Sequence, residues 1–393
     1  MSGRAASIPL SLVTDPPSTS LVRKDHPMTT LLGIPNIRSR PDPNLADAPR
    51  SGGLADRFGR VATDLRVSLI DKCNLRCSYC MPADGMAWLP KQMLMTAEEI
   101  VRIVSIGCDH LGVEELRLTG GEPLVRKDLE HIIGAIREAQ PTLPISMTTN
   151  AIGLDRRAAA LKAAGLNRIN VSLDTLHPET FAELTRRPML DKVLAGIRAA
   201  AEAGLGPIKI NAVLLRGSND DELTDLTAWA VANGYEMRFI EHMPLDGDHA
   251  WKKAKVITAA EIRERLAERF VLAPDPMERA GSPAERFEVR DIGSDPLSVA
   301  LGKVGIISSV TEPFCAACTR TRITAEGRIR SCLFSHEETD LLEIVRSGAS
   351  DEDIAQRWRD AMWTKPRAHG SDIVGFESSG FVQPTRTMSA IGG

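Results

Sequence analysis

Six of the seven cysteines in this 393-residue chain form two triplets with different internal spacing. The triplets are Cys73, Cys77 and Cys80, and Cys315, Cys318 and Cys332. Each triplet supplies three thiolates, whereas a tetrahedral or cubane metal site takes four ligands. A metal with one open position can bind and activate a further molecule. Both triplets therefore predict sites of chemistry.

The composition is that of a soluble globular protein. Hydrophobic residues make up 43% and charged residues 25%, and the net charge of −4 argues against a general nucleic-acid binder. No apolar run approaches the ~18 residues of a membrane span, and the N-terminus lacks the apolar core of a secretory signal. We therefore expect a cytoplasmic protein whose reduced thiols bind metal rather than form disulfides.

Residues 1–60 are expected to form a disordered extension. Prolines interrupt any regular period there, and Ser, Thr and Gly are frequent. The prolines are Pro9, Pro16, Pro17, Pro27, Pro35, Pro41, Pro43 and Pro49. After this extension we expect a core domain over 61–250 and a C-terminal domain over 251–393.

Strands and helices alternate from residue 65 to about residue 243. The alternation predicts six βα units and a parallel sheet that is buried on both faces. Polar or glycine-containing segments follow the strands, where barrels and doubly wound sheets both place their sites. The pattern therefore leaves open whether the sheet closes. The predicted strands are 65–70, 115–118, 144–148, 168–173, 208–214 and 236–241, and the predicted helices are 96–107, 129–139, 156–164, 178–184, 190–203 and 222–232.

Beyond residue 250 the alternation gives way to shorter elements around the second triplet. The expected elements are a helix at 259–270, a loop or hairpin at 273–298, a strand at 304–310, a hairpin at 323–332 and a helix at 351–362.

The first triplet resembles the iron–sulfur motif of the radical S-adenosylmethionine (SAM) superfamily. Its C-x3-C-x2-C spacing follows a predicted strand, Tyr79 precedes the last cysteine, and Gly120-Gly121-Glu122-Pro123 follows the next strand. The resemblance implies a [4Fe–4S] cluster that leaves one iron for SAM. Glycines allow close backbone approach, and Glu122 can hold the methionine amino group. A structural zinc site or incidental core cysteines are the alternatives, and the lone Cys108 is expected to be buried and inert.

The chain as a whole resembles the MoaA family, the GTP 3′,8-cyclases of molybdenum cofactor biosynthesis. The resemblance extends from about residue 65 to the C-terminus, and few families combine both triplets with a terminal Gly-Gly. It implies a partial (β/α)6 barrel, similar to a TIM barrel, with a C-terminal α+β extension that carries a second [4Fe–4S] cluster. The shared motifs are DKCNLRC at 71–77, YCMP at 79–82, LTGGEPL at 118–124, NVSLD at 170–174, RFIE at 238–241 and Gly392-Gly393.

The resemblance also implies roles for individual residues. The two triplets would ligate the two clusters. The residues implied to contact SAM are Tyr79, Gly121, Ser172 and Met243. Those implied to contact GTP are Arg66, Arg117, Thr148, Lys209, Arg320, Thr321 and Arg322, with Arg238 as a further basic residue near the substrate. Those implied to act in catalysis are Arg320, Arg322, Gly392 and Gly393.

The basic residues among these fit a triphosphate. A triphosphate carries about four negative charges, and buried phosphates need charge-assisted donors. A cation on a strand that faces a barrel interior needs an anionic partner, although each one could instead point outward. Arg320 and Arg322 alternate with Thr and so share one face, whereas Arg186-Arg187 at a helix end is expected to be solvated. The strand cations are Arg66, Arg117, Lys209 and Arg238.

For the reaction, the resemblance implies that a 5′-deoxyadenosyl radical from SAM takes hydrogen from C3′ of GTP, and that C3′ then attacks C8. The product would be (8S)-3′,8-cyclo-7,8-dihydroguanosine 5′-triphosphate. The second cluster would hold the guanine base, and Gly392-Gly393 would thread into the site. The implied partners are an electron donor and a downstream cyclic pyranopterin synthase, for a monomer or homodimer that uses neither nucleic acid nor membrane.

Two alternatives remain open at this point. A two-cluster radical SAM peptide or sulfatase maturase usually carries more cysteines in its C-terminal domain than the three that follow Cys108 here. A zinc-binding interaction protein would be colourless, whereas a cluster protein is brown.

Overall fold

The computed structural model describes residues 44–279, 281–294, 298–372, 376 and 381–391. Most of the expected N-terminal extension, and Gly392-Gly393, lie outside these ranges. The prediction of disorder is wrong for residues 44–60. They contain the 3-10 helix η1 (Leu45–Asp47) and strand β1 (Leu54–Ala55), which pairs with β2 (Val61–Ala62) and buries Leu54 completely. The folded chain therefore begins before the predicted boundary, and the buried Leu54 lies after Pro49, the last proline of the expected extension.

Six parallel strands, β3 to β8, form the centre of one large sheet and pair in chain order. The predicted six βα units are thereby confirmed. Most apolar side chains of these strands are buried, as a sheet covered on both faces requires. The strands are β3 (Asp64–Ser68), β4 (Glu115–Thr119), β5 (Ile145–Thr149), β6 (Arg168–Ser172), β7 (Lys209–Leu214) and β8 (Glu236–Glu241).

The C-terminal segment extends this sheet at both edges instead of forming a separate one. Strand β11 (Gly302–Ile307) pairs in parallel with β8, and β12 (Arg320–Ile323) pairs in parallel with β3. Antiparallel strands continue outward on each side, and the hydrogen-bonded order ends at β14 and β9 without closing. These outer strands are β9 (Phe270–Pro274), β10 (Glu285–Asp291), β13 (Arg328–Arg330) and β14 (Thr339–Asp340). The expected boundary at residue 250 therefore separates neither two sheets nor two cores.

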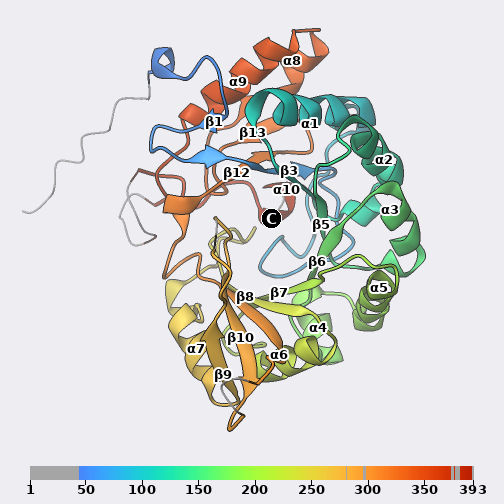
Figure 1. The fold of residues 1–393 in the computed structure, drawn as a ribbon, viewed down its shortest axis with the longest axis vertical. Helices are drawn as coiled ribbons and strands as arrows, with labels where there is room; N and C mark the ends of the chain where they lie inside the picture. The colour runs from blue at the N-terminus through green and yellow to red at the C-terminus, as the bar shows by residue number, and fades with distance from the viewer. Residues whose placement is uncertain (1–43, 280, 295–297, 373–375, 377–380, 392–393) are drawn as a thin grey trace, which may run out of the picture. The chain divides into compact units, whose positions relative to one another are not determined.

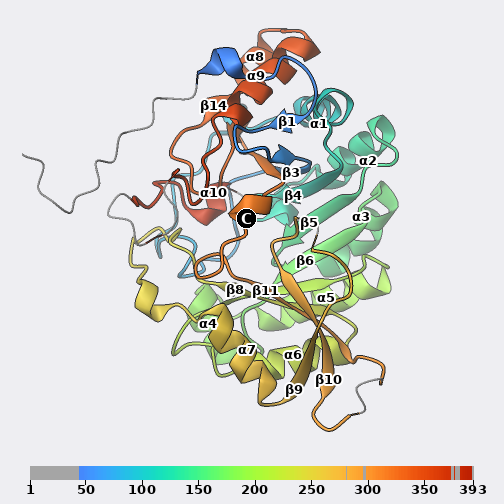
Figure 2. The ribbon, with the colours of Figure 1, turned by 60° about the vertical axis from the view of Figure 1, so that its left-hand side comes forward.

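Helices cover the outer face of the sheet, which curves around a central space (Figure 1). Figure 2 shows α1, α2 and α3 along the outer side of β3 to β6. Helix α1 begins with the predicted capping box between Thr96 and Glu99. No helix in the described ranges is both long and apolar enough to cross a membrane. The helices are α1 (Ala97–Leu111), α2 (Leu129–Ala139), α3 (Ala158–Ala164), α4 (Pro178–Thr185), α5 (Leu190–Glu202), α6 (Leu223–Ala232), α7 (Ala259–Ala267), α8 (Leu342–Arg346), α9 (Asp351–Trp363) and α10 (Met388–Ile391).

Helix α9 packs back onto the start of the barrel through Trp358, which is fully buried. The indole lies beside Gly107 of α1, where a Cβ atom would be in van der Waals contact with it at 3.6 Å. Its Nε1 donates a hydrogen bond of 2.9 Å to Oγ1 of Thr321 in β12. One side chain thus joins the C-terminal helix, the added edge strand and the first barrel helix.

We expect Trp358→Ala to lower the free energy of unfolding by about 3–5 kcal/mol, because it leaves a cavity and an unpaired Thr321 hydroxyl. Anaerobic urea denaturation measures the change, with the half-exposed Met93→Ala as a control expected to stay within about 0.5 kcal/mol. Equal midpoints for the two variants would contradict this role for Trp358.

Candidate active site

A cavity of about 320 Å³ lies at the carboxyl ends of the parallel strands and extends between the two cysteine loops. Its volume is in the range of small-molecule sites. Most of the predicted site residues border it. The predicted residues that line it are Arg66, Cys73, Cys77, Tyr79, Cys80, Arg117, Gly121, Thr148, Ser172, Arg238, Met243, Cys315, Cys318, Arg320, Arg322 and Cys332.

The first cysteine loop follows β3 and is held in shape by two arginines. Nη1 of Arg76 donates to the carbonyls of Cys73 (2.7 Å) and Leu75 (2.8 Å). Nη1 of Arg186 in turn donates to the carbonyls of Arg76 (3.3 Å) and Met81 (3.1 Å). The expectation that Arg186 is merely solvated is therefore wrong, although its neighbour Arg187 is exposed. Sequence reasoning missed this role because it depends on backbone carbonyls about a hundred residues away in the chain.

The three thiols of this loop are poor thiolates without a bound cation. Burial raises the pKa of Cys73 to about 11 and that of Cys80 to about 12, and it raises the pKa of Cys77 well above its usual value. The charges of Cys73 and Cys80 also raise the pKa of Cys77, so the three thiols lie close together. Thiolate ligands for iron–sulfur clusters are deprotonated by the metal itself. All three thiols are free and face the cavity, so their donor set fits a cluster.

The Gly120-Gly121 pair allows the next loop to lie directly against the cysteine loop. A side chain on Gly121 would come within 2.3 Å of the carbonyl oxygens of Asp71 and Lys72. Glu122 is buried beside it and accepts hydrogen bonds from Thr149 Oγ1 (2.6 Å) and the Asn150 amide (2.7 Å). Burial raises the pKa of Glu122 to about 7. This carboxylate braces the loops, a role beyond the SAM contact expected of it.

Asp174 is a site residue that sequence reasoning missed. It accepts a 2.6 Å hydrogen bond from the Tyr79 hydroxyl and a 2.8 Å bond from the Val213 amide. Burial raises its pKa to about 6. Asp174 therefore fixes Tyr79 at the wall that Gly121, Ser172 and Met243 also form. Its place two residues after Ser172, at the end of β6, was the available signal.

Three arginines stand side by side on adjacent strands. Arg322 of β12 is in register with Arg66 of β3, and Arg66 is in register with Arg117 of β4. Neighbouring parallel strands lie about 4.8 Å apart, and residues in register point to the same face. Burial and the neighbouring Arg117 lower the pKa of Arg66 to about 9, and burial lowers that of Arg117 to about 10. The cavity therefore holds closely packed positive charges.

Carboxylates among the described residues offset part of this positive charge. Asp64 lies among the arginines, which hold its pKa below the usual value although burial opposes them, and its contact with Arg66 is 3.5 Å. Glu236 pairs with Arg238 at 2.5 Å and lies 3.9 Å from Lys209. Asp64 and Glu236 do not line the cavity, whereas three other carboxylates line it and accept hydrogen bonds from amide and hydroxyl donors. These other carboxylates are Glu122, Asp174 and Glu241.

Lys209 and Thr321 differ from the other predicted GTP residues. The structure places the Lys209 side chain beside Glu236, and neither Lys209 nor Thr321 is among the residues that line the cavity. Burial and the neighbouring Arg238 lower the pKa of Lys209 to about 7. The Thr321 hydroxyl accepts from Trp358 on the opposite face of β12. The expected contact of the Thr321 side chain with GTP is therefore not supported, because the alternation that turns Arg320 and Arg322 inward turns Thr321 outward.

The second cysteine loop differs from the first in its cationic surroundings. Although burial raises the pKa of the Cys318 thiol, Arg320 and Lys365 bring it down to about 5. The Arg320 guanidinium also lies 4.8 Å from the centre of the Phe314 ring. Cys315, Cys318 and Cys332 all line the cavity, and burial and the charges of Cys332 and Cys318 raise the pKa of Cys315, so the three sulfurs lie close together. This set of thiols also fits a cluster. In the described part of the chain, no group of three or more His, Cys, Asp or Glu is placed to hold a single metal ion.

The chain end reaches the cavity. Met388 and Ser389 of α10 line it, and the Ser68 hydroxyl of β3 donates a 3.3 Å hydrogen bond to the carbonyl of Ile391. The predicted catalytic residues Gly392 and Gly393 follow directly and lie outside the described residues.

Comparison with known proteins agrees with this architecture. Residues 67–230 match the model of the radical SAM superfamily, and residues 235–371 match that named Molybdenum Cofactor Synthesis C. A crystal structure of Streptococcus suis SuiB bound to S-adenosylmethionine shares the fold, with a TM-score of 0.52 at 16% identity over 78% of this chain and 72% of that chain.

Two relatives found by sequence have much higher identity to this chain than SuiB has. A GTP 3′,8-cyclase of Paenarthrobacter nicotinovorans is 67% identical over 87% of this chain and 97% of its own length. A GTP 3′,8-cyclase of Streptomyces coelicolor is 54% identical over 88% of this chain and 98% of its own. The chain therefore belongs to the GTP 3′,8-cyclase family of the radical SAM superfamily.

Proposed function

We propose that this protein is a GTP 3′,8-cyclase that converts GTP to (8S)-3′,8-cyclo-7,8-dihydroguanosine 5′-triphosphate in molybdenum cofactor biosynthesis. The observation that carries the proposal is the row formed by Arg322, Arg66 and Arg117, buried in a cavity between two cysteine triplets. Family membership supports the same reaction.

The arginine row is the proposed triphosphate site. Guanidinium groups give charge-assisted, bidentate hydrogen bonds to phosphate oxygens. A triphosphate with about four negative charges would offset the cations that the protein's own carboxylates compensate only in part. Arg238 on β8 lines the cavity and would contact the opposite side of the nucleotide, whereas Lys209 lies beside Glu236 and would act on the nucleotide only through its charge.

Each cysteine triplet would hold a [4Fe–4S] cluster, the first with SAM and the second with the guanine base of GTP. When bound, these groups supply the one-electron chemistry that removes a hydrogen atom from the ribose. The chain's own part is to bind and to orient. Tyr79, fixed by Asp174, and the close Gly120-Gly121 backbone shape the SAM wall, while the arginines set the position of the ribose through the phosphates.

Helix α10 contributes to this enclosure. Because Met388 and Ser389 line the cavity and the Ile391 carbonyl accepts a hydrogen bond from Ser68 of β3, α10 would help to exclude water from the site. The proposed role of Gly392-Gly393 inside the site rests on this approach and on the family resemblance. An electron donor, a cyclic pyranopterin synthase and a cytoplasmic location complete the proposal.

Anaerobic turnover tests the function directly. We expect the cluster-loaded protein, given SAM, dithionite and GTP, to form 5′-deoxyadenosine and the cyclised nucleotide together, and to form neither when ATP replaces GTP. Mass spectrometry and chromatography measure both products. Absence of GTP-dependent 5′-deoxyadenosine would contradict the proposal, and its formation only with an added peptide would favour the maturase alternative.

Arg117→Met tests the triphosphate site by opposite effects on activity and stability. Loss of a charged hydrogen bond of about 1.5–3 kcal/mol should lower kcat/KM for GTP about ten- to a hundredfold. The ligand-free protein should be as stable as the parent or more stable, because like-charge repulsion is relieved. The exposed Arg187→Met is the matched control and should change neither quantity. A destabilised Arg117→Met protein with unchanged kcat/KM would show that Arg117 is structural.

A further inference from the structure

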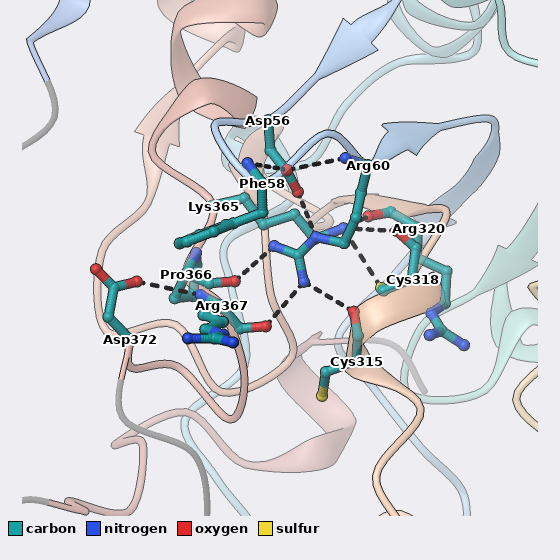
Figure 3. Close-up of polar contacts among 10 residues, drawn as sticks. All are labelled: Asp56, Phe58, Arg60, Cys315, Cys318, Arg320, Lys365, Pro366, Arg367 and Asp372. Carbon is teal, nitrogen blue, oxygen red and sulfur yellow. Dashed lines mark hydrogen bonds and ion pairs between the residues drawn. The ribbon is translucent and has the colours of Figure 1, made fainter.

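Lys365, just beyond the end of α9, is a buried lysine outside the residues that line the cavity. Its side chain is only 2% exposed and reaches the back of the second cysteine loop (Figure 3). Nζ donates to the carbonyl of Arg320 at 2.7 Å and lies 3.4 Å from Sγ of Cys318 and 3.5 Å from the Cys318 carbonyl.

The Cys318 sulfur is the one group among these contacts that can carry a negative charge. Within the described ranges, no carboxylate lies close enough to Lys365 to form an ion pair. A buried ammonium without an anion is costly. The 3.4 Å contact therefore places the lysine beside a sulfur that would be a ligand of the second cluster.

Hydrogen bonds from Arg60 hold the segment that directly follows Lys365 in place. Arg60 is paired with Asp56 at 2.5 Å, and its guanidinium donates to the carbonyls of Pro366 (2.7 Å) and Arg367 (2.9 Å), directly after Lys365. The same guanidinium donates to the carbonyl of Cys315 at 2.8 Å. Figure 3 shows Arg60 between the cysteine loop and the 365–367 turn. The N-terminal segment thus fixes the lysine relative to two of the three cysteines.

The first triplet has no equivalent contact in the described structure. Donors to the Cys73 sulfur there are neutral, namely the Leu75 amide at 3.5 Å and the Asn150 side-chain amide at 3.9 Å. The cation beside Cys73 is Arg76, which donates to the Cys73 carbonyl. Hydrogen bonds to ligand sulfurs and nearby positive charge favour the reduced, more negative state of a cluster. The two sites should therefore differ in reduction potential.

We propose that Lys365 is a positioning residue for the second cluster, and that its hydrogen bond to the Cys318 thiolate raises the reduction potential of that cluster. The proposal rests on the proposed second cluster. It assigns to Lys365 an electrostatic effect on the cluster and no contact with GTP.

The test uses the full-length chain with Cys73, Cys77 and Cys80 replaced by Ala, so that only the second cluster forms. Midpoint potentials are measured by anaerobic redox titration monitored by electron paramagnetic resonance, and iron is counted per chain. We expect Lys365→Met to shift the one-electron reduction equilibrium at least tenfold toward the oxidised state, which is 59 mV. Lys365→Arg, which keeps charge and donor, should stay near the parent.

Lys365→Gln keeps a hydrogen-bond donor without the charge, and its midpoint potential should lie between those of the Met and Arg variants. It replaces the Met variant in the test if the Met variant binds no iron. The exposed Lys162→Met is the control and should leave the midpoint unchanged. Met and Gln variants with the parent's midpoint and full iron content would overturn the role of Lys365. A parent that binds no iron would instead overturn the proposed second cluster.

Discussion

Positive charge buried on three adjacent strands is the constraint on which the site depends. Arg322, Arg66 and Arg117 occupy one row of the sheet, and mutual repulsion and burial destabilise their charged forms. Asp64 is a carboxylate among them and offsets part of this positive charge. An anionic ligand removes this penalty, because its negative charges neutralise the buried arginines when it binds. The surrounding fold must therefore be stable enough to hold these cations together.

The C-terminal strands added to the sheet provide that stability and also bring the two cysteine loops together. Because β12 pairs with β3, the second loop is brought to the strand that leads into the first. Trp358 fixes the outer face of β12 while Arg322 faces the cavity, so one four-residue strand serves both core and site. On the same side, Arg60 ties the N-terminal segment to Cys315. Segments from both ends of the chain thus converge on the second loop.

The sequence was sufficient to predict the features that depend on a local pattern. The strands β3 to β8, the capping box at Thr96 and the inward face of Arg320 and Arg322 are set by periodicity and short motifs. The sequence was insufficient where a residue's hydrogen-bond partner lies far away along the chain. Asp174, Arg186 and Lys365 have their roles only through groups that folding brings to them. The expected strand at 304–310 corresponds to β11, but the parallel pairing of β11 and β12 with the barrel strands escaped prediction, because a short strand carries little sign of which neighbour it joins. The structured part of residues 44–60 escaped because one buried leucine outweighed a proline-rich composition.

The central claim, that partly compensated arginine charge selects a triphosphate, is tested most directly by comparing ligand fragments. Thermal unfolding of the anaerobic protein would be measured with GTP, inorganic tripolyphosphate and guanosine at equal concentrations. The account predicts that tripolyphosphate alone raises the melting temperature by a large share of the GTP effect, and that added salt weakens this effect. Stabilisation by guanosine but not by tripolyphosphate would contradict it.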